Sequence, residues 1–142
     1  MSTDKQTARA GALSSLAVHP RTTANPRRVL VVEDNVDSVR TLSALIAEMG
    51  HSVSYAINGY AALEIGRKQR PQFVLLDLAL PAMNGFDLCS RMKAEPAFAN
   101  SRIIALTGHG DQVHRQRSRE AGCELHLIKP VAAQTIFDLL EG

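Results

Sequence analysis

The chain has 142 residues and a formal net charge of +2. This length suits one compact domain and fits two domains poorly. The small net charge gives no argument for binding nucleic acid or a membrane surface. The sequence contains no run of about 18 apolar residues, so we expect no transmembrane helix. Because Trp is absent and aromatic residues are only 4% of the chain, we expect an aliphatic core.

Residues 1–26 differ in composition from the rest of the chain. They are rich in Ser, Thr, Ala and Arg and show no sustained hydrophobic period. We interpret them as a flexible N-terminal tail and place the folded domain at residues 27–142.

From residue 27 the pattern alternates between strands and helices. Hydrophobic runs and one polar–apolar alternation predict strands at 29–32, 52–57, 73–76, 102–106 and 125–128. Helical spacing of apolar residues and stop signals predict helices at 36–49, 59–69, 85–94, 111–121 and 133–140. This order predicts an α/β fold with a doubly wound parallel sheet and helices on both faces.

The two cysteines, Cys89 and Cys123, do not have the spacing of a CxxC motif or a Cys/His metal site. Small secreted domains usually carry more cysteines. We therefore interpret both as reduced, packed thiols of a cytoplasmic protein.

Polar residues follow four of the predicted strands directly. They are Glu33 and Asp34, Asp77, Thr107, and Lys129. In such a sheet, ligands bind outside the carboxyl ends of the strands. A polar residue directly after an apolar run needs a reason, so we expect these five side chains to form one site.

The chemistry of this set points to metal-assisted phosphoryl transfer. Three neighbouring carboxylates repel one another, and Mg²⁺ is the usual cation where phosphate is involved. Asp34 and Asp77 are expected to bind it directly, and Glu33 through water. Asp77 would be the nucleophile. Lys129 would pair first with the carboxylate and then with a phosphoryl oxygen, and Thr107 would donate a hydrogen bond to another.

Four stretches carry a family resemblance: residues 29–35 (VLVVEDN), 76–85 (LDLALPAMNG), 104–108 (IALTG) and 128–130 (IKP). Together they resemble the receiver domain of two-component response regulators, over about residues 27–141. The resemblance implies a flavodoxin-like (βα)5 fold whose five-stranded parallel sheet has the strand order 2-1-3-4-5.

The resemblance also implies a function and further site residues. Asp77 would accept a phosphoryl group from a histidine kinase or a histidine phosphotransfer protein, and the backbone carbonyl of Ala79 would complete the Mg²⁺ site. Thr107 and His126 would be the switch residues that respond to phosphorylation. The chain would then be a stand-alone receiver, or the excised receiver of a larger protein. It would regulate an unknown protein partner and would not be an enzyme acting on other substrates.

Several features stay open at this stage. His126 stands where the family often has Tyr or Phe, either as a tolerated variant or as a pH-sensitive switch. Ala79 and His109 could set the lifetime of the phosphoryl group on Asp77. Alternatively, His109 is a solvated side chain of the loop. A basic face could suit an acidic partner or simply be solvated; its members are His114, Arg115, Arg117 and Arg119.

Two alternatives from other classes remain. A flavin or nucleotide enzyme could share the fold, but the chain has no GxGxxG after the first strand and no GxxxxGK[ST]. A phosphorylation-independent binding module could keep the site as a relic. The complete set of acids, hydroxyl and lysine argues against a relic, which is free to lose any of them.

Overall fold

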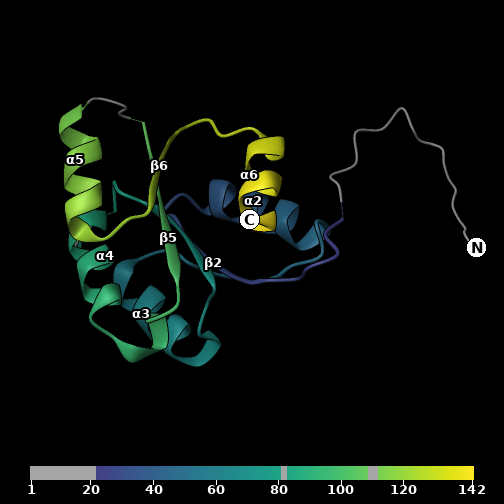
Figure 1. Ribbon diagram of the computed structural model, residues 1–142, viewed down its shortest axis with the longest axis horizontal. Coiled ribbons are helices and arrows are strands. Elements are labelled where there is room, and N and C mark those ends of the chain that lie inside the picture. Colours follow the sequence, from purple (N-terminus) through teal and green to yellow (C-terminus); the bar gives the residue numbers. More distant parts are fainter. Residues whose placement is uncertain (1–21, 81–82, 109–111) are drawn as a thin grey trace, which may run out of the picture.

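The computed structural model describes residues 22–80, 83–108 and 112–142, in which strands and helices alternate (Figure 1). The strands are β2 (Arg28–Val32), β3 (Ser52–Ala56), β4 (Phe73–Asp77), β5 (Arg102–Thr107) and β6 (Leu125–Ile128). The helices are α2 (Val36–Glu48), α3 (Gly59–Gln69), α4 (Gly85–Lys93), α5 (Gln112–Ala121) and α6 (Ala133–Glu141). A short 3-10 helix, η1 (Pro96–Phe98), lies between α4 and β5 and was not predicted.

The five strands form one sheet in the order β3-β2-β4-β5-β6, and every neighbouring pair is parallel. Numbered along the chain, this is the order 2-1-3-4-5, so the predicted flavodoxin-like fold is confirmed. Because all strands run the same way, their carboxyl ends lie at one edge of the sheet. The residues that follow the strands are thereby brought together.

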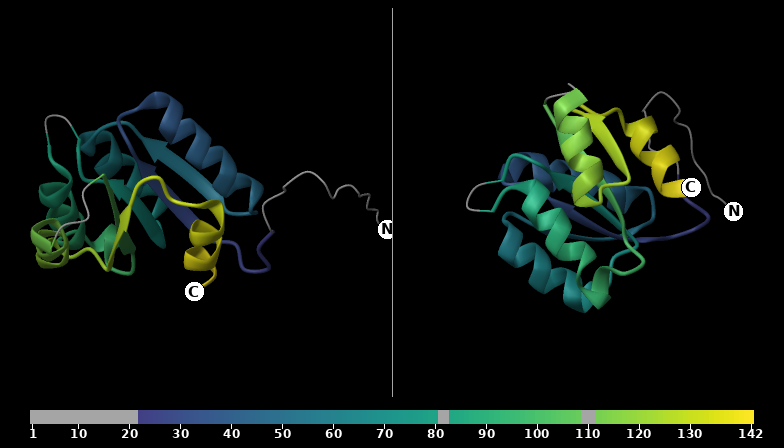
Figure 2. Two further views of the ribbon diagram at one scale, coloured as in Figure 1. Left: turned by 90° about the horizontal axis from the view of Figure 1, so that it is seen from above. Right: turned by 60° about the vertical axis from the view of Figure 1, so that its left-hand side comes forward.

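Alternate residues of the buried strands pack into two separate cores. Leu30, Val74 and Ile103 belong to the core beneath α3 and α4, whereas Val31 and Leu75 belong to the core beneath α2 and α6. Figure 2 (right) shows α5 and α6 on opposite sides of β6. Strands buried on both faces explain the continuous apolar runs in the sequence.

Asparagine residues begin three of the helices. The side chains of Asn35, Asn58 and Asn84 each accept a hydrogen bond from a backbone N–H in the first turn of α2, α3 and α4. These bonds satisfy a donor that the helix itself leaves free. Two of them, at Asn35 and Asn84, also fix the chain direction in the connections that follow the acidic residues.

The chain before residue 27 already contacts the domain. The Thr23 N–H donates to the Met49 carbonyl oxygen at 2.7 Å, and Thr23 is 8% exposed. The Arg27 side chain donates to the Leu140 carbonyl oxygen at 3.1 Å. The division at residue 26 stays a prediction, since residues 1–21 lie outside the described part of the chain.

Among the described residues, no helix combines the length and the apolar character that crossing a membrane requires.

One tight contact in the core gives a stability prediction. Gly66 on α3 faces the buried ring of Phe98 on η1, and a Cβ at position 66 would collide with that ring. Gly66→Ala should therefore lower the free energy of unfolding by about 1–3 kcal/mol, as overpacking does, in urea denaturation. Gly108→Ala is the control, because its Cβ would meet no described atom within 4 Å. Equal stability of the two variants would contradict the contact.

A buried histidine gives a pH prediction. His51 is 5% exposed, and its Nδ1 accepts a hydrogen bond from the Arg27 N–H at 2.9 Å. Burial holds the pKa of His51 below its ordinary value of 6.5. The unfolded chain therefore binds a proton more readily, so this contribution to stability is present at neutral pH and falls as the pH drops through 6.5.

Between about pH 7.5 and about pH 5.5, the His51 contribution should fall by up to about 1 kcal/mol, the worth of one hydrogen bond. His51→Asn keeps an acceptor near Nδ1 but cannot titrate, so its free energy of unfolding should depend less steeply on pH. Urea denaturation at several pH values measures this, and parallel pH profiles for both proteins would refute it.

Candidate functional site

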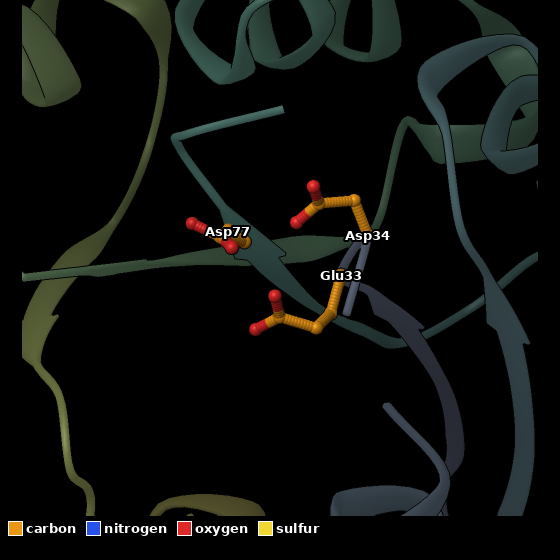
Figure 3. A group of neighbouring side chains, drawn as sticks. All are labelled: Glu33, Asp34 and Asp77. Carbon is orange, nitrogen blue, oxygen red and sulfur yellow. The ribbon is translucent and has the colours of Figure 1, made fainter. Parts of the chain in front are cut away.

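The acidic residues predicted from the sequence come together at the carboxyl edge of the sheet. Glu33 and Asp34 follow β2, and Asp77 is the last residue of β4. One carboxylate oxygen from each lies within 4.8 Å of the others. Figure 3 shows the three side chains gathered at the ends of these two strands. Glu33 and Asp77 are buried, whereas Asp34 is exposed and opens the cluster to solvent.

Lys129, directly after β6, links the two buried carboxylates. Its Nζ lies 2.8 Å from Glu33 Oε2 and 3.0 Å from Asp77 Oδ2. The lysine side chain is 36% exposed, against 8% for Glu33 and 4% for Asp77. One ammonium group thus offsets part of the charge of three acids, and the cluster keeps a negative excess.

Backbone contacts fix the direction of Asp77. Its Oδ1 accepts a hydrogen bond from the Ala79 N–H at 2.9 Å, and the neighbouring Leu78 N–H donates to the Leu106 carbonyl oxygen at 3.0 Å. Oδ1 and Oδ2 therefore have different partners, one a backbone donor and one the Lys129 ammonium. A carboxylate held on both sides is positioned before any ligand arrives.

Gly85 has a role that we did not predict. A Cβ at this first residue of α4 would come within 2.9 Å of the Asp77 carbonyl oxygen and would also collide with the Leu78 backbone. Its N–H donates to the Leu78 carbonyl oxygen at 3.0 Å. Glycine directly after the N-cap Asn84 was a signal for this close approach, because glycine is a poor helix residue.

The charge states of the cluster are set by burial and by mutual hydrogen bonds. Burial, and then the hydrogen bond with Asp77, raise the pKa of Glu33 more than Lys129 lowers it. Burial also acts to raise the pKa of Asp77, but hydrogen bonds with Glu33, Ala79 N–H and Lys129 outweigh it and hold the pKa below its usual value. Asp77 is therefore the more acidic carboxyl group of the pair.

The donor set fits a hard divalent cation. All three side chains offer oxygen, and their negative excess would be relieved by such an ion. The exposed Asp34 lets a hydrated ion approach, which suits Mg²⁺ because it gives up its water reluctantly. The predicted role of the Ala79 carbonyl stays a prediction, since the structure defines a contact only for its N–H.

Thr107 and His126 lie on the neighbouring strands. Thr107, the last residue of β5, is 4% exposed, and its carbonyl oxygen accepts from the Lys129 N–H at 2.7 Å. His126 pairs with Ala105 in the register of β6 and β5, which places it on the sheet face covered by α3 and α4. His109 lies outside the described residues.

The basic face predicted on α5 is only partly free. Arg115, Arg117 and Arg119 are exposed, but the Arg117 guanidinium lies 4.1 Å from the centre of the Phe86 ring on α4. Arg117 therefore helps to hold α5 against α4. Of His114, the fourth member, the structure describes the backbone position and not the side chain.

Comparison with known families identifies the class of protein. The family model for the response regulator receiver domain matches the sequence over residues 29–141, nearly all of the folded part. The chain belongs to this family, whose members act in two-component signalling.

The curated relatives are about as long as the matched region. The polar-differentiation response regulator DivK of Brucella anthropi is 28% identical over 117 residues, which cover 82% of this chain and 95% of the relative. The sporulation initiation phosphotransferase F of Bacillus subtilis is 33% identical over 114 residues, covering 80% of this chain and 90% of the relative. The chain is thus similar to small response regulators.

A solved structure agrees in fold. The receiver domain of a sensor histidine kinase from Pseudomonas aeruginosa superposes with a TM-score of 0.74 and 26% identity, covering 82% of this chain and 96% of that chain. That receiver has a magnesium ion coordinated in its active-site cleft. In the chain described here, Glu33, Asp34 and Asp77 form the group that could hold such an ion.

Removing the lysine tests the electrostatic balance of the site. Lys129→Met should lower the free energy of unfolding by about 1–2 kcal/mol at neutral pH, because two buried carboxylates lose their shared partner while solvent screens part of the cost. Urea denaturation measures this. Lys68→Met, on an exposed position of α3, is the control and should change stability little. A loss no larger than that of the control would show that the ion pair contributes nothing.

Proposed function

We propose that the chain accepts a phosphoryl group on Asp77 in a reaction that requires Mg²⁺, and that it regulates a protein partner through the change that follows. The observation that carries this proposal is the arrangement of Asp77. It is buried, its pKa is held below the usual value, it has one oxygen on the Ala79 N–H and the other on Lys129, and it lies beside two further acids. This is the state a carboxylate nucleophile needs.

The acids divide the work of the site. Asp34 and Asp77 would hold Mg²⁺ directly, with the Ala79 carbonyl, while Glu33 would bind through water. Bound there, Mg²⁺ supplies positive charge against the oxygens of the incoming phosphoryl group. Asp34 is the exposed member, so it also controls entry to the site.

Asp77 and Lys129 would carry out the transfer itself. A carboxylate oxygen of Asp77 attacks phosphorus, the bond from phosphorus to the donor imidazole nitrogen breaks, and the imidazole keeps the bonding electron pair. Lys129 Nζ, which is 3.0 Å from Asp77 Oδ2 before the reaction, then pairs with a phosphoryl oxygen. Positioning and charge stabilisation supply most of the rate enhancement.

Thr107 and His126 would report the reaction to the rest of the fold. The Thr107 hydroxyl would donate to a phosphoryl oxygen, and movement of Thr107 would leave space toward which His126 turns. Their strands are neighbours: Ala105 on β5 is opposite His126, and Thr107 is opposite Ile128 on β6. A shift at the end of β5 can therefore pass to β6 over a short path.

The donor would be a histidine kinase or a histidine phosphotransfer protein. A cavity of about 640 Å³ lies beside the site, between α2 and α6, and Glu33 and Lys129 form part of its wall. Its other wall is largely apolar, with Leu42, Leu45 and Ile136. Because it is continuous with the site, one helix of a donor could pack there while its histidine reaches Asp77. We place the protein in the cytoplasm, without a nucleic-acid or membrane partner.

Phosphorylation by a small donor tests this function. With Mg²⁺ and acetyl phosphate, the wild-type protein should gain one phosphoryl group by intact mass, and chelation of Mg²⁺ should prevent the gain. Asp77→Asn should gain none, and Asp34→Asn should react at least about tenfold more slowly, as loss of one charge-assisted contact implies.

Asp138→Asn is the matched control, because this acid is exposed on α6 and does not belong to the acidic cluster. It should react as the wild type does. Labelling of Asp77→Asn would contradict the assignment of the acceptor. If neither acetyl phosphate nor a phosphorylated histidine phosphotransfer protein labels the wild type, the chain is a phosphorylation-independent binding module instead.

A further inference from the structure

Two buried cysteines lie in contact although they are far apart in the sequence. Cys89 is in the middle of α4, and Cys123 lies between α5 and β6. Their sulfur atoms are 3.1 Å apart, both are free thiols, and their exposed fractions are 0% and 5%. The sequence offered no sign of this contact, since the two residues share no motif.

Contacts beside the cysteine pair hold α4 and the turn after α5 together. The Ser90 hydroxyl lies 3.5 Å from the Ala121 carbonyl oxygen, to which it donates. Gly122 has φ 106° and lies so close to α4 that a Cβ there would come within 2.7 Å of Lys93 Cγ. A larger residue at 122 would be strained at this positive φ and would have to displace the Lys93 side chain.

The turn that carries Cys123 is also anchored independently of the thiols. The Cys123 N–H donates to the Ser118 carbonyl oxygen at 2.9 Å, and the Glu124 N–H donates to the Ile103 carbonyl oxygen at 2.7 Å. The contact between the two sulfur atoms is therefore set by the fold. Forming a bond between them requires a side-chain movement of about 1 Å, from 3.1 Å to the disulfide length of about 2.05 Å.

We propose that Cys89 and Cys123 form a redox-sensitive modification site, in which hydrogen peroxide converts the two thiols into an intramolecular disulfide. This goes beyond the proposed function and does not depend on it, since neither cysteine belongs to the acidic cluster or to Lys129.

The oxidation balances in two steps. The Cys123 thiol loses its proton and attacks one peroxide oxygen, which gives Cys123 sulfenic acid and releases water once the leaving hydroxide takes a proton. The Cys89 thiol then attacks the Cys123 sulfur, so the S–S bond forms, the S–O bond breaks, and a second water leaves. In total, two thiols are oxidised by two electrons and one hydrogen peroxide is reduced to two water molecules.

Cys123 is the thiol that reacts first. It is the more exposed of the two. The hydrogen bond with Cys89 holds the pKa of Cys123 below its ordinary value, whereas the same contact, together with burial, raises the pKa of Cys89. The thiolate is the nucleophile in such reactions, so Cys123 is the attacking sulfur and Cys89 the resolving one.

The cross-link would fix α4 against the beginning of β6. Along the chain, Glu124 and the four residues of β6 separate Cys123 from Lys129, a span of about 20 Å in an extended strand. The disulfide restrains the packing of α5 on α4, in which Arg117 covers Phe86.

Intact mass of the full chain tests the proposal. The reduced protein is treated with hydrogen peroxide, denatured and alkylated with iodoacetamide. We expect the oxidised protein to lose two hydrogen atoms, to stay monomeric and to take up no alkyl group. Treatment with dithiothreitol should restore both alkylation sites. The Asp77→Asn variant should behave identically, which separates this result from the outcome for phosphorylation.

Two single variants define the roles of the sulfurs. Cys89→Ser should stop at the sulfenic acid, visible as one added oxygen and trapped by dimedone, whereas Cys123→Ser should leave Cys89 unoxidised at the same peroxide dose. Cys89→Ala and Cys123→Ala serve if a serine variant fails to fold. Full alkylation of the wild type after peroxide, or a disulfide found only between two chains, would overturn the proposal.

Discussion

The structure depends on one shared ion pair. The Lys129 ammonium lies within 3.0 Å of a carboxylate oxygen of both Glu33 and Asp77, and it joins residues that are 96 and 52 positions apart in the sequence. Two acids buried below 10% exposure would repel each other without this cation. The contact therefore connects the ends of β2, β4 and β6, and it helps to hold the pKa of the buried Asp77 below its usual value.

The parallel sheet makes this contact possible. Its register brings the ends of β2 and β4 together and leaves the loop after Asp77 to be shaped by the Ala79 N–H and by Gly85. Each of these contacts constrains the direction of the Asp77 side chain or of the loop after it more than it stabilises the fold. The result is a carboxylate with two defined partners, while the exposed Asp34 keeps the cluster accessible to a cation.

The order of strands and helices, and the residues of the acidic edge, were predictable because both follow from local patterns. Strands buried on both faces leave apolar runs, and a charged residue directly after such a run marks the carboxyl edge. Contacts between distant segments leave no local period and were missed. Gly66 against Phe98, Gly85 against the Asp77 loop, and the Cys89–Cys123 pair are of this kind. The helix η1 was missed for the same reason, since its Phe98 packs against α3, which is distant in the sequence.

The most direct measurement is the free energy of unfolding with and without Mg²⁺, for the wild type and for Asp34→Asn. If the three carboxylates form one cation site, Mg²⁺ at ten times its dissociation constant should stabilise the wild type by about 1.4 kcal/mol. Asp34→Asn should lose most of this gain and be no less stable than the wild type without the ion, because one repelling charge is gone. Equal stabilisation of both proteins by Mg²⁺ would contradict the account.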